Sequence, residues 1–280
     1  MKVYSNAFFA MNTRFVFVLP NINESKGEEL YEQIKIIADK WERRLSRFDS
    51  KADLFRLNNT AHGYRVTVPI YLAELINLCE DYWKKTEGLF DPTYASVYDL
   101  LKKNENQNIE LIRSQCGWDQ LEWNKVTNTI RFNSEYMQLD FGSFGKGVAL
   151  KQVVQYLKSE GIESAFLSFG ESSIATIGSH PFGKGWPILI SESSLDSKLS
   201  LCDDCISISG MQENGENLQA HIYHPVKREM VSRREIVAVQ CDCPITAEII
   251  STTIYMADLA ERNRLIEKFQ RVKILLKNQQ

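Results

Sequence analysis

The sequence predicts an α+β fold in which mixed sheets pack against helices. Segments typical of strands and of helices are interleaved along the 280 residues, but they do not repeat as the strand–helix–strand units of a parallel sheet. Apolar residues make up 44% of the chain and charged residues 25%, the usual balance of a globular protein. Because no linker or internal repeat divides the chain, we expect one domain spanning residues 1–280.

The first half of the chain predicts a strand, two helices and a hairpin. The strand is Arg14–Leu19, and Ser25 with Glu28 resembles a capping box that starts the first helix. Apolar residues then recur every three or four positions, at Leu30, Ile34, Ile37, Trp41, Leu45 and Phe48. A second helix is expected to begin near Pro69, and a hairpin to turn at residues 124–128.

The second half predicts further strands and three helices. A strand ending near Asp140 leads through glycines into a helix over Lys146–Glu160, which Gly161 ends. Two more helices are expected over residues 246–257 and Leu259–Phe269. The remaining expected strands are Ala165–Phe169, Pro187–Ser191, Ile206–Ser209, Ile236–Gln240 and Val272–Leu276.

Charge and cysteine content narrow the class of protein. The net charge of −3 argues against a generally basic protein that coats nucleic acid. The apolar run Phe15–Leu19 is too short for a secretion signal or a membrane span, so we expect a cytoplasmic protein with six reduced thiols. Cys202 and Cys205 form a C-x-x-C sequence without a second pair of metal ligands, which leaves a redox role as a weaker alternative to a structural one.

Two glycine-rich segments are candidates for an anion site. Residues 140–147, DFGSFGKG, predict a turn into a helix whose first N–H groups and Lys146 would face an anion, although a tight turn alone also fits. Residues 178–185 almost match a phosphate-binding P-loop, but Gly185 stands where that motif requires Ser or Thr. Because Trp186 and Pro187 follow where a helix should start, we expect a loop between strands there.

Three further segments carry possible functional groups. Asp91, held before a proline in residues 88–93, suits a ribose or an amide-bearing ring, with Phe90 available for stacking. His221 and His224 concentrate two of the four histidines, and Glu248 and Thr252 share one helix face as oxygen ligands for a cation such as Mg²⁺. A purely structural role remains the alternative for each of these segments.

In their order along the chain these segments resemble the ApbE family, the FAD:protein FMN transferases. The similar segments are Ala10–Thr13 (family A-M-G-T), residues 45–58 (L-S-R-F-D…L-N), 88–93 (G-x-F-D-P-T), 140–147 (D-L-G-G-I-A-K-G), 167–170, 209–210 with 221–225 (S-G…H-I-I-D-P), and 247–252 (A-D-A-L-S-T). The resemblance runs from Ala10 almost to the end of the chain. Glu248 and His224 stand where the family has aspartates, and Gly145 replaces its alanine.

The resemblance implies a fold related to the T-fold, with a flavin cleft between its substructures, and a Mg²⁺-dependent transfer of FMN from FAD to a threonine of an acceptor protein with release of AMP. The residues that it implies for FAD binding are Met11, Phe48, Leu89, Phe90, Asp91 and Lys146. It further implies that the Gly145 carbonyl, Glu248 and Thr252 bind Mg²⁺ and that His221 is catalytic. An FAD pyrophosphatase and a non-catalytic flavin-binding paralogue remain alternatives on the same scaffold.

Overall fold

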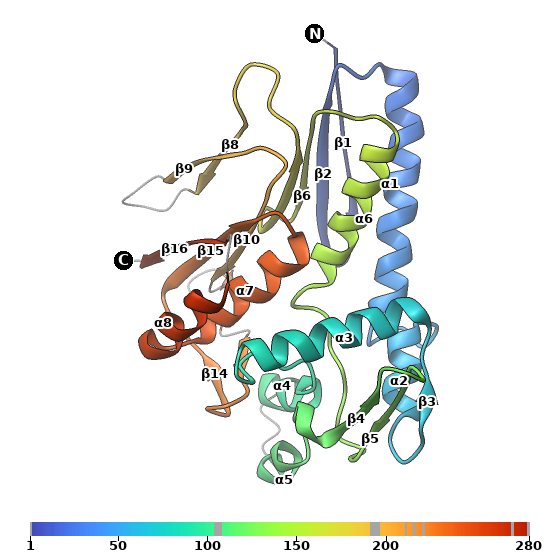
Figure 1. Ribbon diagram of the computed structural model, residues 1–280, viewed down its shortest axis with the longest axis vertical. Helices are drawn as coiled ribbons and strands as arrows, with labels where there is room; N and C mark the ends of the chain where they lie inside the picture. Colours follow the sequence, from blue (N-terminus) through green and yellow to red (C-terminus); the bar gives the residue numbers. More distant parts are fainter. Residues whose placement is uncertain are drawn as a thin grey trace.

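The computed structural model describes residues 2–103, 108–190, 197–210, 212–214, 217–219, 222–269 and 272–278. Helices account for much of the described chain (Figure 1). They are α1 (Glu24–Leu45), α2 (Asp53–Thr60), α3 (Ile70–Lys85), α4 (Ala95–Lys102), α5 (Ile109–Ser114), α6 (Gly145–Ser159), α7 (Pro244–Met256) and α8 (Leu259–Lys268), with a 3₁₀ turn at Trp118–Gln120.

A seven-stranded sheet in the order β1-β2-β6-β7-β10-β15-β16 is the centre of the fold, and every neighbouring pair in it is antiparallel. Its strands are β1 (Val3–Ala10), β2 (Thr13–Pro20), β6 (Ala165–Phe169), β7 (Ser173–Ile177), β10 (Cys205–Gly210), β15 (Glu235–Cys241) and β16 (Lys273–Asn278). Smaller sheets pair β8 (Trp186–Ile190) with β9 (Ser197–Leu201), β11 (Gln212–Asn214) with β12 (Asn217–Gln219), and β13 (Ile222–His224) with β14 (Glu229–Val231). An antiparallel sheet with separate helices confirms the predicted α+β class.

The two faces of the large sheet are covered differently. Helices α1, α6 and α7 pack on one face, where α1 and α6 lie side by side, while the β8–β9 hairpin lies on the other (Figure 1). Successive side chains of β10 point to opposite faces of the sheet. Cys205 belongs to the large core on the helix side, and Ile206 belongs to the smaller core beneath the β8–β9 hairpin. This layering places α6, α7 and the edges of β7 and β10 in contact.

A second region lies beyond the C-terminal end of α1. It contains α2 to α5 and a three-stranded sheet, β3-β5-β4, formed by β3 (Val66–Thr67), β5 (Thr129–Phe132) and β4 (Leu121–Asn124) (Figure 1). Asn58 joins the two regions, since its amide exchanges two hydrogen bonds of 2.9 Å with the backbone of Leu139 just before the glycine turn.

Most predicted elements are confirmed, and the exceptions have local causes. Asn23, not Ser25, caps α1, because its side chain accepts from the Lys26 N–H at 3.0 Å. The prediction of a strand ending near Asp140 is wrong, because this segment forms only an isolated bridge between Tyr94 and Gln138. The segment 178–185 is confirmed as a loop, which connects β7 to β8.

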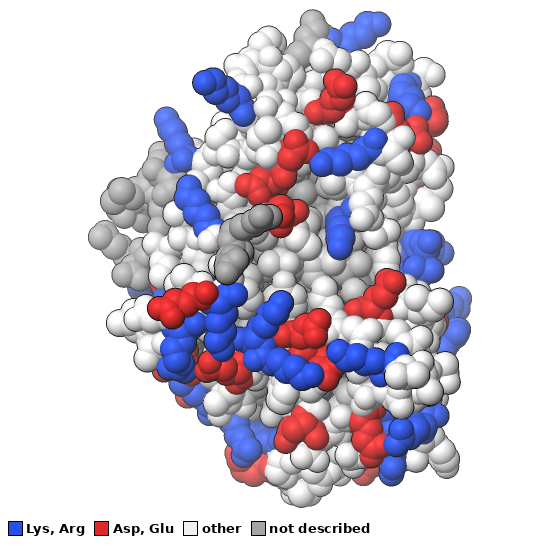
Figure 2. Space-filling view, viewed as in Figure 1, with Lys and Arg blue, Asp and Glu red and all other residues white. Residues whose placement is uncertain are grey.

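The face shown in Figure 2 has no extended patch of only positive or only negative side chains, because Lys and Arg lie among Asp and Glu there. Glu87, for example, contacts both Arg264 and Lys268 at 3.4 Å and 2.6 Å. Within the described ranges, no helix is both long and apolar enough to cross a membrane.

Candidate functional site

The carboxylate of Glu248 lies where α6, α7 and β7 meet. Only 3% of the residue is exposed. Its Oε2 accepts the backbone N–H of Gly147 at 2.6 Å, and its Oε1 accepts the hydroxyl of Ser173. Burial raises the pKa of this carboxyl, and the charge of Lys146 together with the two hydrogen bonds opposes the rise. A single carboxylate thus connects three elements that are far apart in the sequence.

Gly147 makes this approach possible. A Cβ at this position would lie 2.8 Å from Glu248 Oε2, 2.8 Å from the Pro244 carbonyl oxygen and 2.9 Å from the Ile245 Cα. Two of these three contacts are with backbone atoms, which cannot rotate away. The last glycine of the segment 140–147 therefore allows α6 to pack closely against α7, and its N–H faces a carboxylate of the protein itself.

Two adjacent serines hold the charged groups of the site. Ser172 accepts a hydrogen bond of 2.9 Å from the Lys146 Nζ, and Ser173 donates to Glu248. Sequence reasoning missed both serines, because two serines at the start of a short strand carry no recognisable spacing. Their only sequence signal is their place directly after Gly170 and Glu171, at the end of a segment that was part of the resemblance.

Thr252 lies one helical turn after Glu248 within a cluster of hydroxyl groups. Its Oγ1 is 3.3 Å from the Ser209 Oγ, and the Ser251 hydroxyl lies 2.8 Å from Ser209 and 3.0 Å from Ser207. The cluster joins α7 to β10, so hydroxyl oxygens continue the polar surface that Glu248 begins.

Gly145 is the first residue of α6, and Met11 lies beside it. A Cβ at Gly145 would be 3.4 Å from the Met11 Cε, an ordinary van der Waals contact. Met11 has a positive φ of 51° and lies in the tight turn between β1 and β2. This turn is next to the start of α6. The structure therefore brings Met11, Gly145, Lys146 and Glu248 to one place.

Phe48 lies outside the helix on which the sequence placed it. Helix α1 ends at Leu45, and Phe48 is 74% exposed, so its expected place on the buried apolar stripe is wrong. Its ring lies against the Arg47 guanidinium, with 4.2 Å between the ring centre and Cζ. Arg47 binds Asp99 with two hydrogen bonds of 2.6 Å and 2.7 Å and Asp140 with one of 2.9 Å, which places the exposed ring near the beginning of the glycine turn.

Leu89 and Phe90 are core residues in this structure. Each is 3% exposed, and the Phe90 ring packs against the edge of Phe144, with 5.9 Å between the ring centres. The expectation that Phe90 offers a free face for stacking is therefore wrong here, because the protein covers the ring. Its contact with Phe144 places residues 88–93 directly behind the turn that starts α6.

Asp91 is held by three hydrogen bonds. Its Oδ1 accepts from the Thr93 N–H at 3.0 Å and hydroxyl at 2.6 Å, and its Oδ2 accepts from the Trp118 N–H at 2.9 Å. Burial is the largest influence and raises the pKa of Asp91 to about 6, while these hydrogen bonds oppose the rise. The carboxylate is fixed in place, as expected for a residue before a proline.

The two histidines of residues 221–225 cannot be compared, because His221 lies outside the described residues. His224 is 1% exposed, and its Nδ1 accepts the N–H of Lys227 at 3.1 Å. The proton of the neutral ring is consequently on Nε2, which lies 3.9 Å from Glu261 Oε2. Burial lowers the pKa of His224, so this residue is a packed neutral imidazole at the end of β13.

The predicted metal ligands fit a hard cation in their chemistry. They offer a carboxylate, a hydroxyl and a main-chain carbonyl, which are the oxygen donors that Mg²⁺ prefers. The described residues contain no metal-binding cluster of three or more His, Cys, Asp or Glu, and the predicted set uses only one such side chain. None of the described ion pairs includes Glu248, so no side chain of opposite charge contacts this buried carboxylate. A bound cation would compensate its charge.

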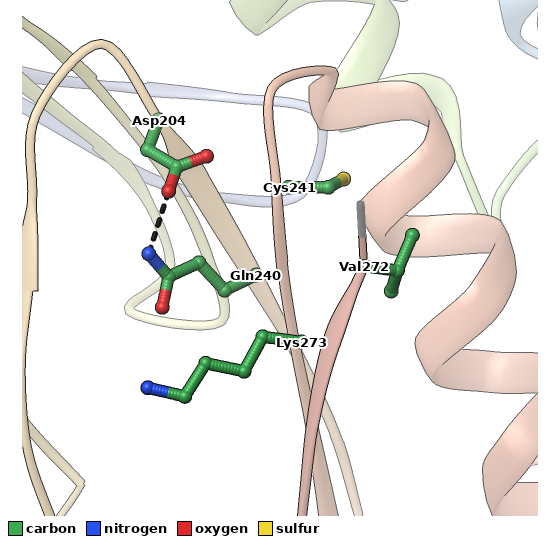
Figure 3. Close-up of a pocket in the computed structure, with 5 residues that line it drawn as sticks. All are labelled: Asp204, Gln240, Cys241, Val272 and Lys273. Carbon is green, nitrogen blue, oxygen red and sulfur yellow. Dashed lines mark hydrogen bonds between the residues drawn. The ribbon is translucent and has the colours of Figure 1, made fainter. Parts of the chain in front are cut away.

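A pocket of about 290 Å³ lies elsewhere, at the paired ends of β15 and β16. Figure 3 shows its lining residues, Asp204, Gln240, Cys241, Val272 and Lys273. None of the predicted flavin or metal residues is among them, so this pocket is separate from the polar cluster around Glu248.

Comparisons with known proteins agree on a family. The sequence is 25% identical over 194 residues to a FAD:protein FMN transferase of Chlamydia trachomatis and 26% identical over 213 residues to that of Chlamydia muridarum. These alignments cover 66% and 72% of this chain but only 60% and 66% of the relatives, so the chain matches less than two thirds of their length.

Solved structures show the same fold. The flavin transferase ApbE of Vibrio cholerae superposes with a TM-score of 0.84 at 20% identity and covers 98% of this chain and 93% of its own. An ApbE protein of Thermotoga maritima also reaches 0.84, at 18% identity, with 100% and 97% covered. The family profile described as the ApbE family matches residues 11–276. This chain, with the fold of solved ApbE proteins and a match to the family over nearly its whole length, belongs to the ApbE family.

Proposed function

We propose that this protein transfers FMN from FAD to a threonine hydroxyl of an acceptor protein, with Mg²⁺ in the site and with release of AMP. Relatives that carry the name FAD:protein FMN transferase and neighbours that are flavin transferases support this activity. The observation that carries the proposal is the buried Glu248 carboxylate beside Lys146 at the start of α6, inside the segments on which the resemblance rests.

The start of α6 supplies positive potential for a pyrophosphate. The side chain of Lys146 would attract the phosphates, whereas the N–H groups of Gly145 and Gly147 already donate to the Phe141 carbonyl and the Glu248 carboxylate. Glu248, Thr252 and the Gly145 carbonyl would hold Mg²⁺, which when bound neutralises charge on phosphate oxygens. The net charge of the chain is −3, so these local groups, and not the protein's overall charge, attract the dinucleotide.

The reaction forms one phosphoester bond and breaks one phosphoanhydride bond. The threonine Oγ attacks the phosphorus of the FMN half, and AMP leaves with the bridging oxygen. The hydroxyl proton passes to a base near neutral pKa, for which we propose His221. Met11 lies beside Gly145, and Phe48 lies against Arg47, which binds Asp140; both are proposed to contact the flavin half of FAD.

The test uses the purified full-length chain with FAD and Mg²⁺, with and without the acceptor domain of a characterised flavin transferase. Covalent flavin on the acceptor together with equimolar AMP supports the proposal. Release of free FMN and AMP at the same rate without an acceptor would overturn it in favour of a pyrophosphatase, and FAD bound but unchanged would overturn it in favour of a flavin-binding protein.

A pair of variants tests the assigned ligand. Glu248→Ala is expected to abolish Mg²⁺-dependent turnover, because it removes the only carboxylate of the assigned set. Glu267→Gln removes a carboxylate from the exposed face of α8 and serves as the control with unchanged turnover. Equal rates in the two variants would remove Glu248 from the site.

A further inference from the structure

Cys205 and Cys241 face each other across two strands. Cys205 opens β10 and Cys241 ends β15, and the antiparallel register pairs them directly. Opposed residues of antiparallel strands have Cα atoms about 4.5 to 5.5 Å apart. Disulfides span Cα separations of about 4.4 to 6.8 Å, so the register alone places this pair within bonding range.

The two cysteines also lie together inside the helix-side core. Both residues are buried in the same cluster, and the Cys205 Sγ donates to the Cys241 carbonyl oxygen at 2.8 Å. Hydrogen bonding between the two side chains lowers the pKa of Cys241 and raises that of Cys205, so Cys241 is the thiol that would begin disulfide formation as a thiolate. The pairing suggested by the sequence is different, because Cys202 is exposed and its Sγ lies beside the Ser179 hydroxyl at 3.3 Å.

We propose that Cys205 and Cys241 are a reversible disulfide site, formed by a small two-electron thiol oxidant. Each thiol loses its hydrogen, one S–S bond forms, and the oxidant takes up the two protons and two electrons. With diamide, the N=N bond of the oxidant becomes HN–NH. A dithiol reverses the step by disulfide exchange.

A pocket lies next to β15, at the strand end that carries Cys241. Cys241 contributes to the pocket wall together with Lys273, and Figure 3 shows Gln240 and Cys241 on opposite sides of β15. Cys205 is only 2% exposed and Cys241 4%, so a small reagent reaches the sulfurs when the strand ends open locally.

The position of the pair gives the bond a structural effect. Cys241 is followed within three residues by Pro244, the start of α7, and Cys205 shares its face of β10 with Ser207, which contacts Ser251 on α7. A bond here would close a loop between positions 36 residues apart and would fix β10 to the strand that leads into α7. The proposal does not depend on the transferase activity.

Tryptic mapping of the full-length protein tests the site. Cleavage after Lys198 and Lys227 leaves Cys202 and Cys205 together in residues 199–227, whereas cleavage after Arg234 and Arg262 leaves Cys241 and Cys243 in residues 235–262. The reduced, folded protein is treated with diamide, free thiols are alkylated, and the digest is examined without reductant. We expect residues 199–227 joined to 235–262, lighter by two hydrogens and separated by dithiothreitol.

Fragment ions of the wild-type pair assign the sulfurs without any variant. The joined peptides should persist in Cys202→Ser and Cys243→Ser and disappear in Cys205→Ser and Cys241→Ser, with circular dichroism confirming that each variant is folded. A bond inside residues 199–227, a bond through Cys243, or full alkylation of all six thiols after diamide would each overturn the proposal.

Discussion

Gly147→Ala is expected to destabilise the protein, although the same exchange inside most helices is favourable. Alanine has a higher helix propensity than glycine by about 1 kcal/mol. Here, however, the added Cβ would lie 2.8 to 2.9 Å from three atoms on α7, and two of them belong to its backbone. Real contacts of a Cβ are longer, so α6 and α7 must move apart.

The magnitude follows from the contacts that this movement costs. Overpacking of a tight interface costs about 1–3 kcal/mol. Separation also weakens the 2.6 Å hydrogen bond from the Gly147 N–H to the Glu248 carboxylate, and a bond to a charged group contributes about 1.5–3 kcal/mol. After subtraction of the propensity gain, we expect the free energy of unfolding to fall by about 2–4 kcal/mol.

Gly145→Ala, in the same helical turn, is the matched control. A Cβ there would meet only side-chain atoms, Met11 Cε at 3.4 Å and Leu45 Cδ1 at 3.6 Å. We expect this variant to unfold within about 0.5 kcal/mol of the wild type in urea denaturation followed by circular dichroism. If Gly147→Ala proves as stable as Gly145→Ala, the close packing of α6 on α7 and the role assigned to Gly147 are refuted.

Three further predictions concern other contacts. Ser173→Ala removes a donor to the buried Glu248 and should lower the unfolding free energy by about 1–3 kcal/mol in urea titration; an unchanged midpoint would contradict this bond. The pKa of Asp91 is raised to about 6, so its contribution to stability is present below pH 4 and lost as the pH rises through 6. The stability of Asp91→Asn relative to the wild type should therefore increase between pH 4.5 and 7. A difference that stays constant over this range would exclude the raised pKa. Glu235→Ala leaves the buried Arg262 without its two 2.6 Å hydrogen bonds and should cost about 3–5 kcal/mol by thermal or urea unfolding, and a loss below 1 kcal/mol would show that water reaches the guanidinium.

Local patterns predicted the helices well because their signals lie within a few residues. The glycine turn before Lys146 and Gly161 after Glu160 predicted α6 to within one residue at each end, and Gly161 takes the positive φ of 76° that favours glycine at the end of a helix. Phe48 shows where such patterns fail. The apolar spacing continues through Phe48, but Ser46 accepts the N–H groups of Phe48 and Asp49, and the chain leaves the helix before Phe48.

The rest depended on contacts that no local pattern contains. Arg47 turns away from α1 because two aspartates, 52 and 93 residues later, bind its guanidinium. Ser172 and Ser173 can be recognised as partners of Lys146 and Glu248 only in the folded structure, where the start of β7 lies next to the start of α6. Family resemblance gave the candidates Glu248, Lys146 and Met11 together, and the structure adds the glycine and the serines that hold them.

The connections of Glu248 have a consequence for folding and ligand binding. Its two hydrogen-bond partners lie 101 and 75 residues away along the chain, so no fragment with only one of these segments contains the site. Contacts between such distant segments form only when most of the chain is already organised. Any ligand held there binds the native state and not the unfolded chain, so its binding energy is added to the stability of the whole sheet and its helices. The ligand-free protein would then unfold more often than the ligand-bound protein, and proteases would cleave it faster.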